Sequence, residues 1–257
     1  MRQRAGARAV RAAAVVALLG VLSACSTGDD DPTLDGAIPT TRVTETTSSS
    51  STSTTSTTAA AACPPVERAH DREGVLEQPA DVDGDGQPDV VQSFPDGDHV
   101  TLLVDLGAGG GARTEIASRE EAAVGLLGAE VLDPHDAREV IWVRVGAGAS
   151  TTVLGLYHLD GCTLVAATFE NGDPVEIPIG GTVGTASGAR CGSQTDPDAD
   201  LLVYEATLIT GREYEIVTTE YRWEDGQLAR SPKSAPGVSR SDDLSQASAF
   251  ECGDLAL

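Results

Sequence analysis

The sequence predicts an all-β domain that follows an N-terminal region without a hydrophobic core. Three observations lead to this prediction: short apolar runs rich in β-branched residues, turn signals containing Gly or Asp-Gly between these runs, and a Ser/Thr-rich region before them. We expect a single hairpin-rich domain over residues 63–257, partly propeller-like or sandwich-like, after a signal peptide (residues 1–24) and a disordered linker (residues 25–62).

The first 24 residues have the charge pattern of a signal peptide. Four arginines and no acidic residue precede the apolar run AAAVVALLGVL, which is too short to span a membrane as a permanent anchor. The run ends in LSAC, residues 22–25. This tetrapeptide resembles the lipobox of bacterial lipoproteins, and the resemblance implies that diacylglyceryl is added to the Cys25 thiol and that the chain is cleaved before it. The alternative is an ordinary cleavage site with an incidental cysteine.

A lipid on Cys25, with palmitate among its acyl chains, would anchor the protein to the cell membrane without spanning it. The linker that follows contains runs such as TTSSSSTSTTSTT and has too few apolar residues to build a core. A flexible tether of this length has a typical end-to-end distance of roughly 35 Å. We therefore expect the folded domain to lie outside the cytoplasm, clear of the lipid head groups.

The remaining cysteines predict two disulfides, because an exported chain with an even number of cysteines usually pairs them. Three pairings are possible. We prefer one bond between Cys63 and Cys162 and another between Cys191 and Cys252, and a Cys63–Cys252 bond that joins the two ends of the domain is the rival. No Cys-x-x-Cys or Cys/His spacing indicates a zinc site.

The charge of the chain excludes nucleic acid as a partner. The formal net charge of -23 becomes -27 when the four arginines of the signal peptide are removed. A surface this acidic repels phosphate backbones and anionic head groups.

The predicted domain divides into strands and turns. Eight runs predict strands, at residues 89–94, 99–106, 139–146, 151–159, 162–169, 175–180, 200–209 and 214–223. Turn signals lie at residues 95–98, 107–112, 159–161, 170–174 and 224–227. The one helix candidate, residues 119–127, is short. Hairpins should therefore predominate.

Two segments of the domain resemble each other at an offset of 50 residues, which aligns Asp89 with Glu139. They are ADVDGDGQPDVV from Ala80 and AEVLDPHDAREVI from Ala129. A period of this length is typical of a propeller blade or a similar β unit. Chance similarity between two amphipathic hairpins is the alternative.

The first of these segments contains a candidate calcium site in DVDGDGQPD, residues 81–89. Calcium prefers six to eight oxygen ligands, and carboxylates at alternate positions of a tight loop can converge on one ion. The candidate ligands are Asp81, Asp83, Asp85, Gln87 through its backbone carbonyl, and Asp89. An EF-hand is excluded, because Gln92 stands where the bidentate Glu is needed and a strand follows the loop. The alternative is an acidic turn whose carboxylates accept hydrogen bonds from backbone amides.

A loop of the form D-x-D-G-D-G-x-x-D that leads into a strand resembles the calcium loops of FG-GAP or VCBS-type repeats. Such repeats occur in integrin-like β-propellers and in many bacterial surface proteins. The resemblance covers residues of about 80–160 and implies one structural calcium ion. The second copy is longer and has LDPH at residues 132–135, so we assign no metal to it. Too few copies are present for a complete propeller, and a smaller sandwich-like domain is equally expected.

No catalytic signature is found in the sequence. The histidines are isolated, and no G-x-S-x-G elbow surrounds a serine. We therefore expect non-catalytic binding at the cell envelope, with an envelope protein or a glycan as partner; the alternatives are a cell-wall or carbohydrate hydrolase and an accessory subunit of a membrane complex. The strand aromatics would form a sugar-stacking or protein-contact platform if exposed, and the core if buried, which we prefer. They are Trp142, Trp223, Tyr157, Tyr204, Tyr214 and Tyr221.

Overall fold

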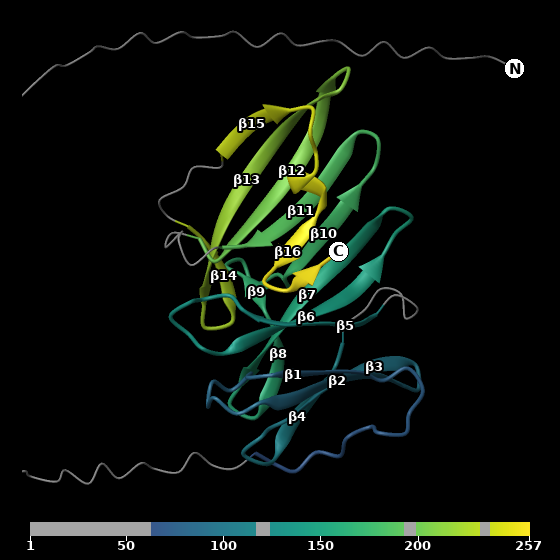
Figure 1. Cartoon of the computed structure of the whole chain (residues 1–257), viewed down its shortest axis with the longest axis vertical. Helices are drawn as coiled ribbons and strands as arrows, with labels where there is room; N and C mark the ends of the chain where they lie inside the picture. Colours follow the sequence, from purple (N-terminus) through teal and green to yellow (C-terminus); the bar gives the residue numbers. More distant parts are fainter. Residues whose placement is uncertain (1–62, 117–123, 193–198, 232–236) are drawn as a thin grey trace, which may run out of the picture. The chain divides into compact units, whose positions relative to one another are not determined.

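The structure is a computed structural model that describes residues 63–116, 124–192, 199–231 and 237–257 (Figure 1). These residues form strands, turns and one short 3-10 helix, and the described part of the chain contains no α-helix. The all-β prediction is confirmed. The predicted signal peptide, Cys25 and the predicted linker lie outside the described residues.

The first sheet has four antiparallel strands in chain order. They are β1 (Leu76–Ala80), β2 (Asp89–Asp96), β3 (His99–Asp105) and β4 (Gly111–Glu115). Residues 91–94 and 101–104 are buried, so both faces of the central hairpin are covered. The segment before β1 covers one face: Ala69 packs on Phe94 and Leu103, and its N–H donates to the buried side-chain oxygen of Gln92 at 3.0 Å.

The second sheet has thirteen strands. Its main order is β5 (Gly125–Val131), β6 (Glu139–Ala147), β7 (Thr151–Asp160), β10 (Glu176–Gly181), β11 (Thr185–Cys191), β12 (Leu201–Thr210), β13 (Glu213–Glu224), β14 (Gln227–Arg230) and β9 (Thr168–Phe169). Outside this order, β8 (Thr163–Ala166) pairs with β7, β15 (Gly237–Ser241) with β13, β16 (Phe250–Cys252) with β11, and β17 (Leu255–Ala256) with β16. Most pairs are antiparallel, and β9 with β14 and β16 with β11 are parallel.

Strand β6 separates two hydrophobic cores, because successive side chains of a strand point to opposite faces. Ile141 and Val143 face a core that is shared with the first sheet, including Val91 and Leu102. Trp142 faces a second core, where its ring centroid lies 4.8 Å from that of Phe250. A strand buried on both faces reads as a continuous apolar run, and this explains the EVIWVRV sequence.

The C-terminal hairpin, strands β16 and β17, packs against β5 on the side of the second core. Strand β16 lies parallel to β11, and the Cys191–Cys252 disulfide joins them with a Cα–Cα distance of 4.7 Å. The hairpin turn is held by Glu130 of β5, whose carboxylate accepts the N–H of Asp254 at 2.9 Å. The C-terminal hairpin therefore covers one side of the second core.

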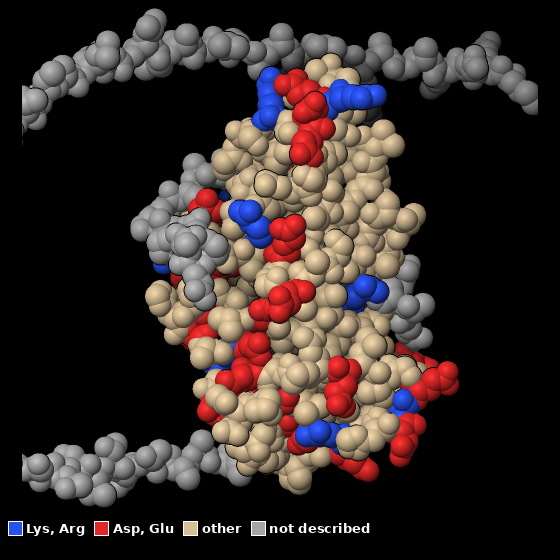
Figure 2. All heavy atoms as spheres, in the orientation of Figure 1, with Lys and Arg blue, Asp and Glu red and all other residues tan. Residues whose placement is uncertain are grey.

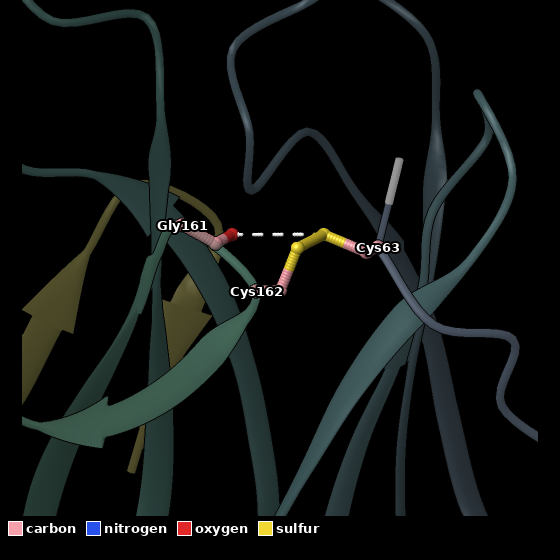
Figure 3. The surroundings of a disulfide bond; sticks show 3 residues. All are labelled: Cys63, Gly161 and Cys162. Atoms are coloured by element: carbon pink, nitrogen blue, oxygen red, sulfur yellow. Dashed lines mark hydrogen bonds between the residues drawn. A yellow bond between two sulfur atoms is a disulfide. The ribbon is translucent and has the colours of Figure 1, made fainter. Parts of the chain in front are cut away.

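The second disulfide, between Cys63 and Cys162, joins the segment before the first sheet to the turn between β7 and β8 (Figure 3). Its Cα–Cα distance is 5.3 Å. The Cys63 Sγ atom lies 3.8 Å from the carbonyl oxygen of Gly161. Sulfur in a disulfide carries no proton, so this is a van der Waals contact. The preferred pairing of the four cysteines is confirmed in the structure, and the Cys63–Cys252 rival is not formed.

The helix candidate at residues 119–127 is wrong where the structure describes it. Residues 119–123 lie outside the described residues, and Gly125, Leu126 and Leu127 begin β5. Leu126 packs against the first core and Leu127 against the second, so consecutive leucines suit a strand that is buried on both faces. A register shift at Gly128 interrupts the alternation further and hides the strand from a pattern search.

The two segments that resemble each other occupy equivalent places in the strand order. Residues 81–88 connect β1 to β2, and residues 132–138 connect β5 to β6. In both cases the next two strands, β3 and β4 or β7 and β8, continue the antiparallel pairing in chain order.

Candidate metal site

The predicted calcium loop connects the edge strand β1 to β2. Asp81 follows the last residue of β1, and Asp89 is the first residue of β2. Between them, Gly84 and Gly86 have φ angles of 75° and 80°, in the left-handed region that side chains disfavour. The Asp-Gly alternation therefore allows a tight loop whose carboxylates turn inward.

Three of the four loop carboxylates converge. One oxygen each from Asp81, Asp83 and Asp89 lies within 4.8 Å of the others. Ligand oxygens lie about 2.3–2.6 Å from a calcium ion, so two oxygens on one ion can be about twice that distance apart. The three carboxylates thus fit a single cation. Asp85 is exposed and lies outside this group, and its carboxylate accepts the N–H of Gln87 at 2.7 Å. The backbone carbonyl of Gln87 stays a predicted ligand.

The loop carboxylates also accept hydrogen bonds from the backbone. The two oxygens of Asp81 accept the N–H groups of Gly84 at 2.9 Å and Gly86 at 3.0 Å. Those of Asp89 accept the N–H groups of Val82 at 2.9 Å and Gly107 at 2.8 Å. A carboxylate has about four lone-pair sites, so these bonds leave room for a metal. The same bonds would hold the loop as an acidic turn without one.

Burial and the neighbouring acids disfavour the ionised form of Asp89. Its side chain is buried, and burial is the main reason why its pKa lies above the ordinary aspartate value. Hydrogen bonds from Gly107 and Val82 oppose this increase, and the nearby charges of Asp83 and Asp81 add to it. A bound cation would stabilise the ionised form and reverse the shift.

The loop is fastened to the second sheet through Glu139, the first residue of β6. The N–H of Asp81 donates to the Glu139 carboxylate, and the Asp81 carbonyl accepts the N–H of Glu139 at 2.9 Å. Burial raises the pKa of Glu139, and the hydrogen bond from Asp81 opposes that effect. Arg138 packs on the loop: a Cβ atom added to Gly84 would lie 2.8 Å from its Cγ. The candidate site is therefore also a joint between the sheets.

The loop at residues 132–138 is built differently, although it occupies the equivalent place. Asp136 is bound by the Arg138 guanidinium, with two contacts of 2.9 Å to Nε and one of 2.5 Å to Nη2. The Asp133 carboxylate accepts the N–H of His135 at 2.8 Å. An arginine thus neutralises the acid, and within the described residues no second group of converging acids was found.

A pocket of about 280 Å³ adjoins the candidate site. Its lining includes Glu139 and Arg138 beside the loop, Asp160 at the end of β7 and Asp225 in the β13–β14 turn. His158 forms one wall, edge-on to Trp223 with ring centroids 5.6 Å apart. Burial lowers the pKa of His158, and the charge of Asp160 partly opposes this. Sequence reasoning missed this pocket, since its residues are scattered along the chain and follow no motif.

The strand aromatics are mostly core residues. Trp142, Trp223, Tyr157 and Tyr204 are buried, which confirms the preferred interpretation for these four. Tyr214 and Tyr221 are partly exposed. Only these two of the predicted set could belong to a binding platform.

Among the charged side chains that Figure 2 shows, acidic ones are more numerous than basic ones. Asp and Glu side chains follow one another from the β12–β13 hairpin down to the first sheet, with few Lys or Arg side chains among them. The two disulfides indicate an oxidising, extracytoplasmic compartment. In the part of the chain that the structure describes, no helix has the length and apolar character needed to cross a membrane.

No protein-family model matches the chain, and no curated protein or solved structure matches it. The resemblance of residues 81–89 to FG-GAP or VCBS-type repeats therefore depends on the loop sequence alone and stays a prediction.

Proposed function

We propose that the protein is a lipid-anchored, extracytoplasmic protein whose β domain is stabilised by calcium and acts in non-catalytic binding at the cell envelope. The observation that carries this proposal is the convergence of Asp81, Asp83 and Asp89 in a loop that is hydrogen-bonded to the second sheet. A metal at this point would stabilise the loop and the joint between the sheets together.

Calcium suits this site better than other common metals. The converging groups are carboxylates, and no His or Cys belongs to the cluster, whereas zinc sites usually include these ligands. Calcium accepts irregular sets of six to eight oxygens, which the carboxylates, the Gln87 carbonyl and water can supply, while magnesium demands a near-ideal octahedron. An ion that binds the folded state alone stabilises it by mass action.

Thermal melting of the purified protein tests the calcium proposal. We expect millimolar calcium to raise the melting temperature relative to excess chelator, and Asp83→Ala to abolish this increase. Asp98→Ala is the matched control, because Asp98 is an exposed aspartate in the β2–β3 turn of the same sheet. An equal calcium effect in all three proteins would mean that the metal binds elsewhere, and no effect in the wild type would leave the loop as an acidic turn.

The anchor is tested separately. A Cys25→Ala variant expressed in a bacterial host should appear in the medium or the soluble extracytoplasmic fraction and lose incorporation of labelled palmitate, because the acylated thiol is gone. Retention of the variant in the membrane would contradict lipid attachment at Cys25.

Non-catalytic binding is proposed because the pocket beside the loop lacks a ready acid–base pair. Its carboxylate Glu139 is already engaged by the N–H of Asp81, and Asp160 and Asp225 are exposed to solvent. A glycoside hydrolase needs two carboxylates held on either side of the scissile bond. Hydrolysis of cell-wall polymers that is lost in a Glu139→Gln variant would overturn this part of the proposal.

A further inference from the structure

The structure leaves one pair of aromatic rings together at the surface. The chain has two Trp, four Tyr and three Phe residues. The buried ones are Phe94, Trp142, Tyr157, Tyr204, Trp223 and Phe250. Of the partly exposed ones, Phe169 and Tyr221 have ring centroids 5.5 Å apart at an interplanar angle of 47°, and both line one cavity. Folding thus concentrates the accessible aromatic surface at one place.

Three adjacent strands build this place, which we call the aromatic ledge: Phe169, Tyr221, Leu228 and Arg230. Strand β14 lies between β13 and β9 (Figure 1). Tyr221 lies directly opposite Arg230, and Leu228 directly opposite Phe169. Directly paired residues, and residues two apart on one strand, share a face of the sheet, so all four side chains of the ledge project the same way. Leu228 is fully buried and forms the floor.

Polar side chains border the ledge. Arg230, Glu170 and Asn171 are exposed and line the same cavity. The Asn171 side chain is held in place by Asp173, whose N–H donates to its oxygen at 3.0 Å and whose carboxylate accepts its amide at 2.7 Å. Within the described part of the chain, neither Arg230 nor Glu170 forms a side-chain hydrogen bond or ion pair with another residue. These two groups therefore have free donors and acceptors.

We propose that the aromatic ledge binds a saccharide chain. This inference rests on the proposed binding function and names the class of its ligand. A sugar ring has an apolar C–H face that stacks on aromatic rings and a rim of hydroxyl groups that both donate and accept hydrogen bonds. Glu170 accepts, Arg230 donates, and their opposite charges favour a neutral polyhydroxyl ligand over a free anion or cation. The cavity, of about 560 Å³, falls within the range of ligand pockets and is open to an extended chain.

Calorimetric titration of the purified exported chain tests the proposal with two probes, tetrasaccharides of β-1,4-linked N-acetylglucosamine and of α-1,4-linked glucose. We expect saturable binding of at least one, and a loss of affinity of about tenfold in Phe169→Leu and Tyr221→Leu, which keep apolar volume but remove the ring. Tyr214→Leu is the matched control, because Tyr214 is also partly exposed on β13 but bonds through its hydroxyl to the Val183 carbonyl at 2.9 Å, away from the ledge.

Arg230→Ala provides a variant that does not touch the core, since Arg230 is exposed. It should fold normally and also bind more weakly. Absence of binding by the wild type, or equal affinity in the wild type, Tyr221→Leu and Arg230→Ala, would overturn the saccharide proposal. Calcium-dependent melting and membrane retention are measured independently of it. If saccharide binding is absent while calcium-dependent melting and membrane retention are observed, only the saccharide proposal is wrong, and the calcium and anchor proposals are unaffected.

Discussion

Replacing Asp89 by asparagine distinguishes a metal site from a self-contained acidic turn. Asp89 is buried, and its two oxygens accept the N–H groups of Val82 and Gly107 at 2.9 and 2.8 Å. Asparagine has nearly the same shape but only one accepting oxygen. One of the two backbone N–H groups would therefore face an amide NH₂ group and lose its partner.

The expected loss of stability has two parts. An unpaired buried donor costs about 1–3 kcal/mol whether or not a metal is present. With calcium at a hundred times its dissociation constant, the wild type gains a further ~2.7 kcal/mol that the Asp89→Asn variant cannot retain. In chelator the asparagine also removes a desolvated charge, since burial raises the Asp89 pKa, and this relief reduces the loss. The loss of stability in the variant should thus be larger in calcium than in chelator by ~2.7 kcal/mol, which is the calcium-dependent stabilisation that only the wild type has.

Urea unfolding in millimolar calcium and in chelator measures both parts, with the fluorescence of the buried Trp142 and Trp223 as the signal. Asp96→Asn is the matched control, because Asp96 lies at the other end of β2, where it pairs with Arg72 at 2.9 Å. Its effect should be small and equal in the two conditions. If the loss of unfolding free energy caused by Asp89→Asn is equal in calcium and in chelator, the loop is not a metal site.

Three further predictions concern the joint and its surroundings. Changing Cys63 and Cys162 to serine removes a cross-link between residues with a sequence separation of 99, and should lower the free energy of unfolding by about 4.7 kcal/mol. An unchanged urea midpoint of unfolding would contradict this. Burial lowers the pKa of His158 in the folded protein. The unfolded chain therefore binds more protons than the folded protein at pH values between this lowered pKa and about 6.5. Stability should fall as the pH drops through this window, and His158→Phe should remove that slope; an unchanged slope would exclude His158 as its source. Gly84→Ala places a side chain at a φ of 75° and against Arg138, and should lower the free energy of unfolding by about 1–2 kcal/mol. A variant as stable as the wild type would show that this backbone position is not strained by a side chain.

The strands with strong apolar or β-branched runs were predictable from the sequence. The run at residues 139–146 became β6 and the run at 214–223 lies within β13, because a long run of such residues has few other ways to be buried. Strand β11 was missed, since its sequence TASGARC consists of small and polar residues. A Cβ atom on its Gly188 would lie 2.6 Å from the Ala249 carbonyl oxygen, so the close passage of the C-terminal segment requires this poor strand-former.

The candidate metal loop could be found from the sequence because its acidic residues lie within nine positions of the chain, and the alternation of Asp and Gly encodes the turn locally. Its attachment to Glu139 could not, because Asp81 and Glu139 meet only when two sheets pack together. The offset of 50 residues aligned Glu139 with Asp89, yet the two acids accept different backbone groups. Positions that the 50-residue offset aligns thus make different contacts, which depend on the strands packed beside them.

The position of the Cys63–Cys162 bond determines how the domain would carry a mechanical load. A pull on the chain before Cys63 passes through the disulfide into the β7–β8 turn of the second sheet. The first sheet and the candidate metal loop lie within the covalent ring between the two cysteines, so tension bypasses them. While the bond is intact, the chain between the two cysteines, with a sequence separation of 99, cannot be pulled out. Its extended length would be about 340 Å. A protein stretched between an anchor and a fixed partner would thus carry no load on the loop of residues 81–89.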